Sequence, residues 1–201
     1  MQYGSGVPLH PAENRGYREL YLTGRQTVKR LERLGAAFGG TTRELLEKTV
    51  GSVTRLLEEL VPLTAPYDLY GDVAAQGAGA NLGTVRGAVL DRFLERNQAL
   101  RLAVDDLEHL TTLVAYLSSV SETRGAPELA EFCRSWERRL RRQVNAVRRS
   151  AVELGQDPDK AVEPLDPSRT GRAAHRFAWA VGTAGEWTDR QLARRRRGPK
   201  L

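Results

Sequence analysis

The sequence predicts an all-α protein: an up-and-down helical bundle of about five helices, one of them long or kinked. Five segments place apolar residues at three- and four-residue steps, which is the spacing of one helix face. No segment alternates apolar and polar residues with an enrichment in β-branched residues, so we expect no strand. The 201-residue chain is long enough for one good core, and its apolar residues are mostly Leu, Val and Ala, of which Leu and Ala favour helices.

The N-terminal segment, residues 1–12, is predicted to be an extended arm. Its stretch "GSGVPLHP" holds two prolines and two glycines and has no helical periodicity. A first helix is predicted from about Glu13, with an apolar stripe that runs from Tyr17 to Phe38. It should end at the two glycines of residues 39–40, because glycine is common just past the end of a helix.

A second helix is predicted to follow at once. Thr41 and Glu44 have the spacing of a capping box, in which two side chains bond the free N–H groups of a helix start. The apolar stripe of this helix runs from Leu45 to Val61, and Pro62 and Pro66 are expected to close it.

The third helical segment runs from residue 84 to residue 124 and is almost free of Gly and Pro. As one continuous helix it would be roughly 60 Å long, at about 1.5 Å per residue. Its apolar stripe thins at "ERNQALR", residues 95–101, where three polar residues fall together. A continuous rod and a helix with a kink or break at this point both remain open.

Two further helices are predicted in the C-terminal third. One has Pro127 at its first turn and stops at Gly155, which fits the preference for Pro at helix starts and Gly at helix ends. Residues 156–167 form a proline-bearing linker. Asp166 is predicted as the N-cap of the last helix, with Pro167 at its first position.

The chain is therefore divided into an arm (1–12), one helical bundle (13–193) and a basic tail (194–201). No apolar run approaches the ~20 residues that span a bilayer, and the first residues lack the basic and apolar pattern of a secretory signal. Cys133 is the single cysteine, which excludes an intrachain disulfide and a cysteine-based zinc site. We expect a soluble, cytoplasmic protein.

Charge is unevenly distributed along the chain. Residues 134–201 contain 17 Lys and Arg against 8 Asp and Glu, a net charge of +9, whereas residues 1–133 contain 14 against 17, a net charge of −3. Arginine dominates the basic part and suits bidentate contacts to phosphate or carboxylate. The predicted partner-binding residues are three arginines close to one line of the fourth helix and four in the tail: Arg138, Arg142, Arg149, Arg194, Arg195, Arg196 and Arg197.

One cluster has the residue types of a metal site. In "DDLEH", Asp105 and His109 are four residues apart and Asp106 and His109 three apart, so either pair could present two ligands on one helix face, with Glu108 beside them. Di-iron bundles, however, need a Glu-x-x-His motif on each of two helices, and none of the three histidines lies three residues after a Glu. A solvated acidic face that contacts neighbouring arginines is the simpler interpretation.

The glycine-rich stretch at residues 77–87 raises the possibility of a phosphate-binding loop. "GAGANLG" is one residue longer than the dinucleotide fingerprint, and it follows no predicted strand. A weaker anion site remains, in which Gly83, Thr84 and Arg86 open a helix whose free N–H groups face the ligand. A flexible connector or close-packed turn is the alternative.

Three function hypotheses follow. The first is a non-enzymatic interaction or assembly protein that contacts an acidic protein partner, or a second copy of itself, through its arginine-rich C-terminal surface. The second is a ligand- or metal-binding bundle enzyme with its site at Asp105–His109 or at the glycine-rich loop. The third is a non-specific nucleic-acid-binding protein that uses the basic C-terminal third. No cofactor is predicted.

Overall fold

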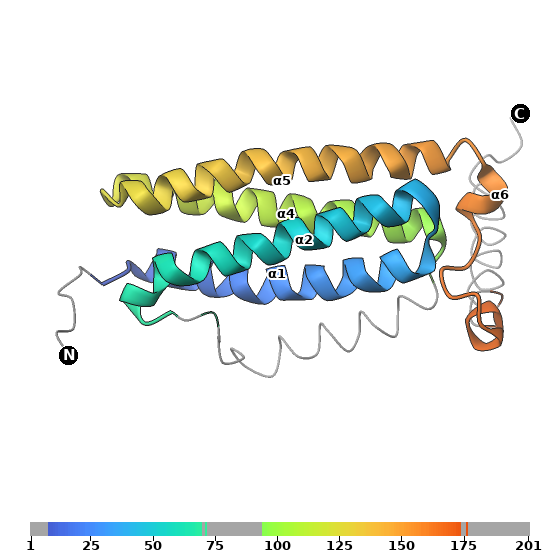
Figure 1. Cartoon of the computed structure of the whole chain (residues 1–201), viewed down its shortest axis with the longest axis horizontal. Helices are drawn as coiled ribbons and strands as arrows, with labels where there is room; N and C mark the ends of the chain where they lie inside the picture. Colours follow the sequence, from blue (N-terminus) through green and yellow to red (C-terminus); the bar gives the residue numbers. More distant parts are fainter. Residues whose placement is uncertain (1–7, 70, 72–93, 174–175, 177–201) are drawn as a thin grey trace, which may run out of the picture.

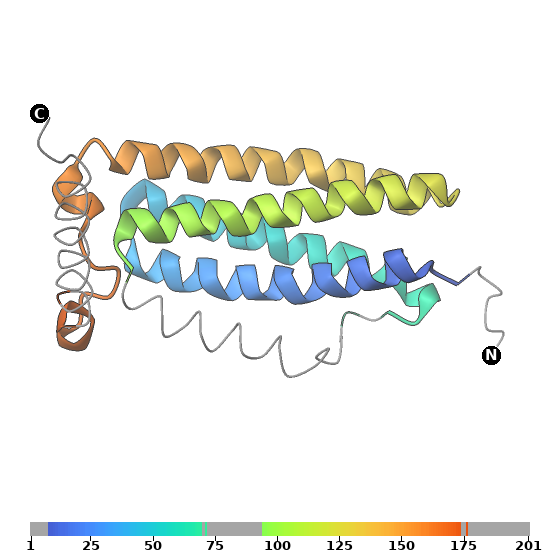
Figure 2. The same cartoon turned by 180° about the vertical axis from the view of Figure 1, so that it is seen from behind.

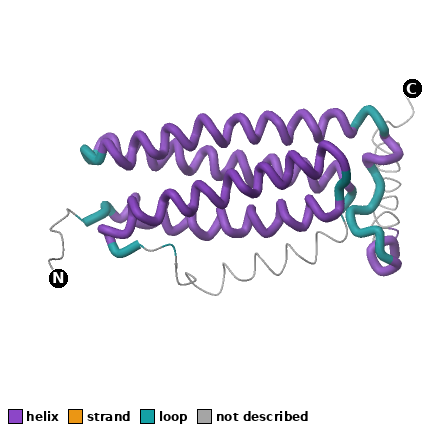
Figure 3. Tube along the Cα trace, in the orientation of Figure 1, coloured by secondary structure: helices purple, strands orange, loops and turns teal. Residues whose placement is uncertain are grey.

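The structure is a computed structural model that describes residues 8–69, 71, 94–173 and 176 (Figure 1). Four long helices lie side by side and form a bundle, so the predicted all-α helical bundle is confirmed. They are α1 (Pro11–Ala37), α2 (Gly40–Thr64), α4 (Arg96–Thr123) and α5 (Pro127–Leu154). Figure 3 shows helices and loops but no strand in this part of the chain.

Neighbouring helices in the bundle run antiparallel. Going around it, α1 contacts α2, α2 contacts α5, α5 contacts α4, and α4 contacts α1. Figures 1 and 2, which view the bundle from opposite sides, show that α2 and α4 point in the same direction. The end of α2 and the start of α4 therefore lie at opposite ends of the bundle.

The starts of α1 and α4 are capped by side chains. His10 accepts from the backbone N–H of Ala12, and Glu13 accepts from the backbone N–H of His10, so α1 begins at Pro11, slightly earlier than expected. At α4, Glu95 has extended backbone and forms a capping box with Gln98. A continuous helix from residue 84 to residue 124 is thus excluded, because α4 begins at Arg96; the part of the segment before residue 94 lies outside the described residues.

Two predicted caps are wrong. Gly39 is the N-cap of α2, with no side-chain bond, so Thr41 already lies inside the helix. The next residue in the turn, Gly40, has a φ of 57°, which favours glycine. At the last predicted helix, Ser168 accepts from the backbone N–H of Gly171, whereas Asp166 accepts from the backbone N–H of Ser168 and so lies two residues before the capping position.

Short helical elements follow α2 and α5 at the two ends of the bundle. The 3-10 turn η1 (Ala65–Tyr67) follows α2, which continues through Pro62 instead of ending there. The linker after α5 contains a one-turn helix, α6 (Pro158–Ala161), which the sequence did not indicate and which lies beyond the end of α5 in Figure 1. As predicted, α5 begins at Pro127 and is capped by Gly155.

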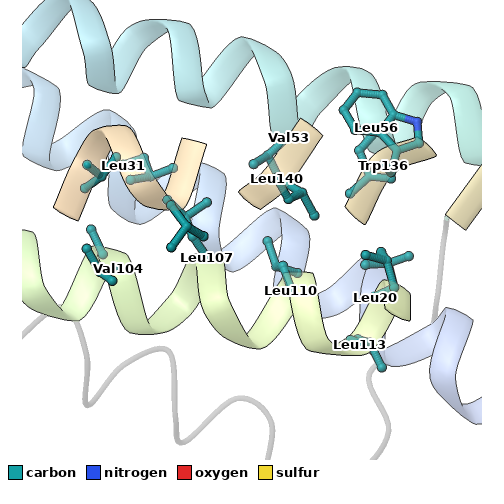
Figure 4. Packing of buried hydrophobic residues seen from close by; sticks show 14 of the residues in the cluster. Leu20, Leu31, Val53, Leu56, Val104, Leu107, Leu110, Leu113, Trp136 and Leu140 are labelled. Carbon is teal, nitrogen blue, oxygen red and sulfur yellow. The ribbon is translucent and has the colours of Figure 1, made fainter. Parts of the chain in front are cut away.

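The core is one cluster made mostly of leucines, with valines, alanines and a few aromatic residues, and Figure 4 shows part of it. The predicted stripes supply it, and α4 and α5 pack most extensively. The largest of the fully buried side chains include Trp136, Tyr17, Tyr21, Leu20, Leu31, Leu34, Leu46, Leu56, Leu60, Leu100, Leu107 and Leu110. Burial of such side chains contributes about 1.5–3 kcal/mol each before the entropy cost of folding is subtracted.

Candidate functional site

The candidate site is a groove between α2 and α5, the least closely packed pair of neighbours in the bundle. Polar side chains connect the two helices along this groove. The hydroxyls of Thr42 and Ser150 lie 3.1 Å apart, and Thr49 donates to the Gln143 side-chain oxygen over 3.1 Å. The surface between the helices is hollowed near Gly51, where an added Cβ atom would meet no atom within 4 Å.

The groove consists of two adjoining hollows of about 380 Å³ each, a size within the range of ligand sites. Both hollows are lined by Lys48, Ser52, Arg139 and Gln143. One of them, the glutamate hollow, is completed by Gly51, Arg55, Glu59 and Trp136. The other, the basic hollow, is completed by Leu45, Arg142 and Ala146.

The glutamate hollow already holds a carboxylate of this chain. Arg55 Nε lies 3.1 Å from Glu59 Oε1. The Trp136 indole N–H donates to Glu59 Oε2 over 3.1 Å, and Arg139 Nη1 lies 3.7 Å from the same oxygen. The guanidinium carbon of Arg139 also lies 4.7 Å from the centre of the Trp136 ring, a cation–π contact. Three donors thus converge on one carboxylate.

The basic hollow has no such internal anion. Three cations line it and no acidic residue does. Lys48 and Arg142 are exposed, and neither makes a hydrogen bond or ion pair with any residue that the structure describes. Unneutralised like charges gathered in a hollow create a positive potential that attracts anions.

The three arginines predicted on α5 have different surroundings. Arg142 lines the basic hollow, as just described. Arg138 is paired along its own helix with Glu131 at 3.4 Å, and Arg149 is exposed outside both hollows. Only one of these arginines therefore belongs to the groove.

The groove cations that the sequence did not single out are Lys48, Arg55 and Arg139. The first two are seven residues apart on α2, which places them on one face of the helix. The small residues Gly51 and Ser52 between them were an available signal for a hollowed helix surface. Nothing local, however, indicated that this face lies beside α5.

The acidic cluster of α4 is divided between two neighbouring helices. Asp106 forms an ion pair with Arg30 of α1, with 2.7 Å between the charged atoms. His109 Nε2 lies 3.2 Å from a carboxylate oxygen of Glu19, also on α1. These contacts turn both side chains toward α1.

The remaining two acids face the other side of α4. Glu108 is paired with Arg148 of α5, and Asp105 lines a hollow of about 580 Å³ beside that pair. In residues 8–69 and 94–173 no three His, Cys, Asp or Glu side chains lie together as a possible metal site. The structure thus distributes the predicted ligands Asp105, Asp106, Glu108 and His109 instead of bringing them together.

Two other sequence predictions lie outside the described residues. These are the glycine-rich loop, with Gly83, Thr84 and Arg86, and the tail arginines, Arg194 to Arg197. Both stay predictions.

A further hollow of about 600 Å³ lies at the end of the bundle where α4 turns into α5. Its buried carboxylate, Glu13, accepts from the Ser121 hydroxyl and from the His10 backbone N–H, each over 3.0 Å. Arg124 Nε lies 3.7 Å from the same side chain. Because these groups satisfy one another, they account for the buried charge as a helix cap and a tie between α1 and α4.

The single thiol belongs to the core. Cys133 is fully buried, with its sulfur 3.9 Å from the Tyr17 hydroxyl. Burial raises the pKa of the Cys133 thiol to about 12, with a hydrogen bond from Tyr17 acting in the opposite direction. A thiol that stays protonated in this way is a poor nucleophile.

Comparisons with protein-family models, with curated proteins and with solved structures find no match for this chain. Among the described helices none is long and apolar enough to cross a membrane. The geometry of the groove is therefore the basis for any functional conclusion.

Proposed function

We propose that this protein is a non-enzymatic interaction module that binds an acidic segment of a protein partner in the α2–α5 groove. The observation that carries the proposal is the lining of the basic hollow, which has three cations and no acid. Lys48 and Arg142 contribute two of these charges without a partner among the described residues. The arginine-rich surface expected from the sequence is thereby extended to include α2.

The shape of the groove favours a chain segment over a single small ion. Its lining on α5 extends from Trp136 to Ala146, ten residue steps that correspond to roughly 15 Å at about 1.5 Å per residue. An extended peptide advances about 3.3 Å per residue, so about four or five partner residues would match this length. Acidic side chains on such a segment could meet the cations of both helices.

The tail supports the same proposal from the sequence side. Four adjacent arginines at 194–197 exceed what a helix end uses, because a cation there is worth only about 0.3–1 kcal/mol. We expect them to add a second, salt-sensitive attraction to the same acidic partner.

The first prediction tests the groove by charge reversal. Lys48→Glu combined with Arg142→Glu replaces attraction by repulsion in the basic hollow. Binding of a synthetic Asp- and Glu-rich peptide, followed by fluorescence anisotropy at low salt, should weaken at least about tenfold, which corresponds to about 1.4 kcal/mol. Both side chains are exposed, so the helical circular-dichroism spectrum and the melting temperature should stay close to those of the unaltered protein.

The matched control reverses two exposed cations on α1, with Arg15→Glu and Lys29→Glu. It changes the net charge equally, because two reversals of two units each take +6 to +2 in both variants. The control should retain most of the binding. Equal loss in both variants would mean that net charge alone attracts the peptide, and the groove would then have no specific role. Tighter binding to duplex DNA than to the peptide would favour the nucleic-acid hypothesis instead.

A further inference from the structure

The two hollows of the groove differ in one respect that has a chemical consequence. Both contain Lys48, Ser52, Arg139 and Gln143, but only the glutamate hollow has an anion of its own, Glu59. From this difference we infer that the basic hollow binds a phosphoryl group, carried on a phosphorylated Ser or Thr of the acidic partner segment. The inference rests on the proposed function and specifies the group that the site recognises.

The charge of the basic hollow matches a dianion better than a carboxylate. Arg139 already shares its charge with Glu59, 3.7 Å away. Lys48 and Arg142 leave two positive charges without a counter-ion among the described residues. A carboxylate neutralises one charge, whereas a phosphoryl group carries about −1.5 to −2 at neutral pH.

The donors of the hollow also fit a group with three oxygens. Arg142 and Arg139 each offer a planar fork of N–H groups, and Lys48 offers a compact ammonium. The Ser52 hydroxyl lines the same hollow and has no side-chain hydrogen bond to any described residue. A carboxylate has only two oxygens, so it would leave part of this donor set without an acceptor.

Gln143 acts as a positioning residue in this arrangement. Its side-chain amide lies 3.1 Å from the hydroxyl of Thr49, which is fully buried and is itself anchored to the backbone oxygen of Leu45 over 2.8 Å. This contact ties Gln143 of α5 to α2 and so fixes the two sides of the hollow relative to each other.

The test compares three synthetic peptides of one acidic sequence that carry Ser, Glu or phosphoserine at one position. Phosphoserine should bind the full-length protein at least about tenfold more tightly than Glu, equivalent to about 1.4 kcal/mol. This preference should fall below pH 6, because the second pKa of the phosphoryl group is about 6 whereas that of Glu is about 4.3. Inorganic phosphate should compete with the phosphopeptide.

Two variants locate the effect within the groove. Arg142→Gln should abolish the preference for phosphoserine, whereas Arg55→Gln, at the glutamate hollow, should retain it. If the Glu and phosphoserine peptides bind equally well, and both bind less to Arg142→Gln, the phosphoryl inference is wrong and the proposed function stands. If no acidic peptide binds, both are wrong. A preference that Arg142→Gln leaves unchanged places phosphoryl recognition elsewhere and overturns the inference.

Discussion

Replacing Gly16 by Ala tests how closely α1 and α4 approach each other. A Cβ atom at this position would lie 2.7 Å from Leu117 Cδ2 and 3.3 Å from Leu117 Cγ, closer than packed carbon atoms allow. Leu117 is fully buried, so it has little room to move away. Gly51 on α2 provides the comparison, because its added Cβ would meet no atom within 4 Å.

The expected magnitudes follow from two opposing effects. Replacing Gly by Ala inside a helix stabilises by about 0.5–1 kcal/mol, and this gain applies to both positions. Overpacking a core contact costs about 1–3 kcal/mol, and this cost applies only to Gly16. Gly51→Ala should therefore stabilise the protein, and Gly16→Ala should be roughly neutral or destabilising by up to about 2 kcal/mol. The difference in free energy of unfolding between the two variants therefore measures the cost of overpacking at Gly16.

Urea unfolding followed by circular dichroism measures both free energies of unfolding, and thermal melts provide a second readout. For a chain of this size about 1 kcal/mol corresponds to about 2–4 °C in melting temperature, so the two variants should differ by roughly 2–12 °C. Leu117→Val shortens the opposing side chain and should cost less in the Gly16→Ala background than alone. Equal stabilisation by the two alanines would refute the close approach of α1 and α4.

Two further predictions concern the buried thiol and the basic tail. Burial raises the pKa of the Cys133 thiol from an ordinary 9.0 to about 12. The contribution of the protonated thiol to the free energy of unfolding is therefore complete below pH 9 and is lost as the pH rises toward 12. The urea midpoint should fall over this pH range, and it should fall less steeply in the Cys133→Ala variant. A Cys133→Ala variant with an equally steep fall would contradict this. Deleting residues 194–201 should leave the melting temperature within a few degrees but weaken acidic-peptide binding at low salt, and high salt should remove the difference. The prediction would be wrong if the truncated protein unfolds, or if peptide binding changes neither on truncation nor with salt concentration.

Most of the helices could be predicted because each stripe of apolar residues indicates one buried helix face. The stripe from Tyr17 to Phe38 became the buried face of α1, and the proline and glycine that bound α5 were identified correctly. Capping was less predictable. Several consecutive residues from Gly39 to Thr42 are of types that can cap a helix, and the local sequence does not determine which of them is the N-cap.

The site could be predicted only in part, for a geometric reason. Arg142 was identified from the arginine-rich stretch of α5, but its counterpart Lys48 lies 94 positions earlier in the chain. A helical pattern separates a polar face from an apolar face, and both residues fall between the apolar positions of their stripes. Which polar faces become neighbours depends on the order in which the helices are arranged around the bundle. The apolar stripe of a single helix does not determine that order.

The α2–α5 groove places the residues of the proposed site apart from those that stabilise the bundle. The core leucines lie on its inner side, whereas Lys48 and Arg142 on its outer side have no partner among the described residues. Exposed charges of this kind contribute little to folding, since even paired ones are typically worth about 0–1 kcal/mol. Thr49 and Gln143 connect the two helices beneath these charges. Charge changes in the hollow should therefore alter binding and leave the fold intact, while changes at Thr49 should alter both.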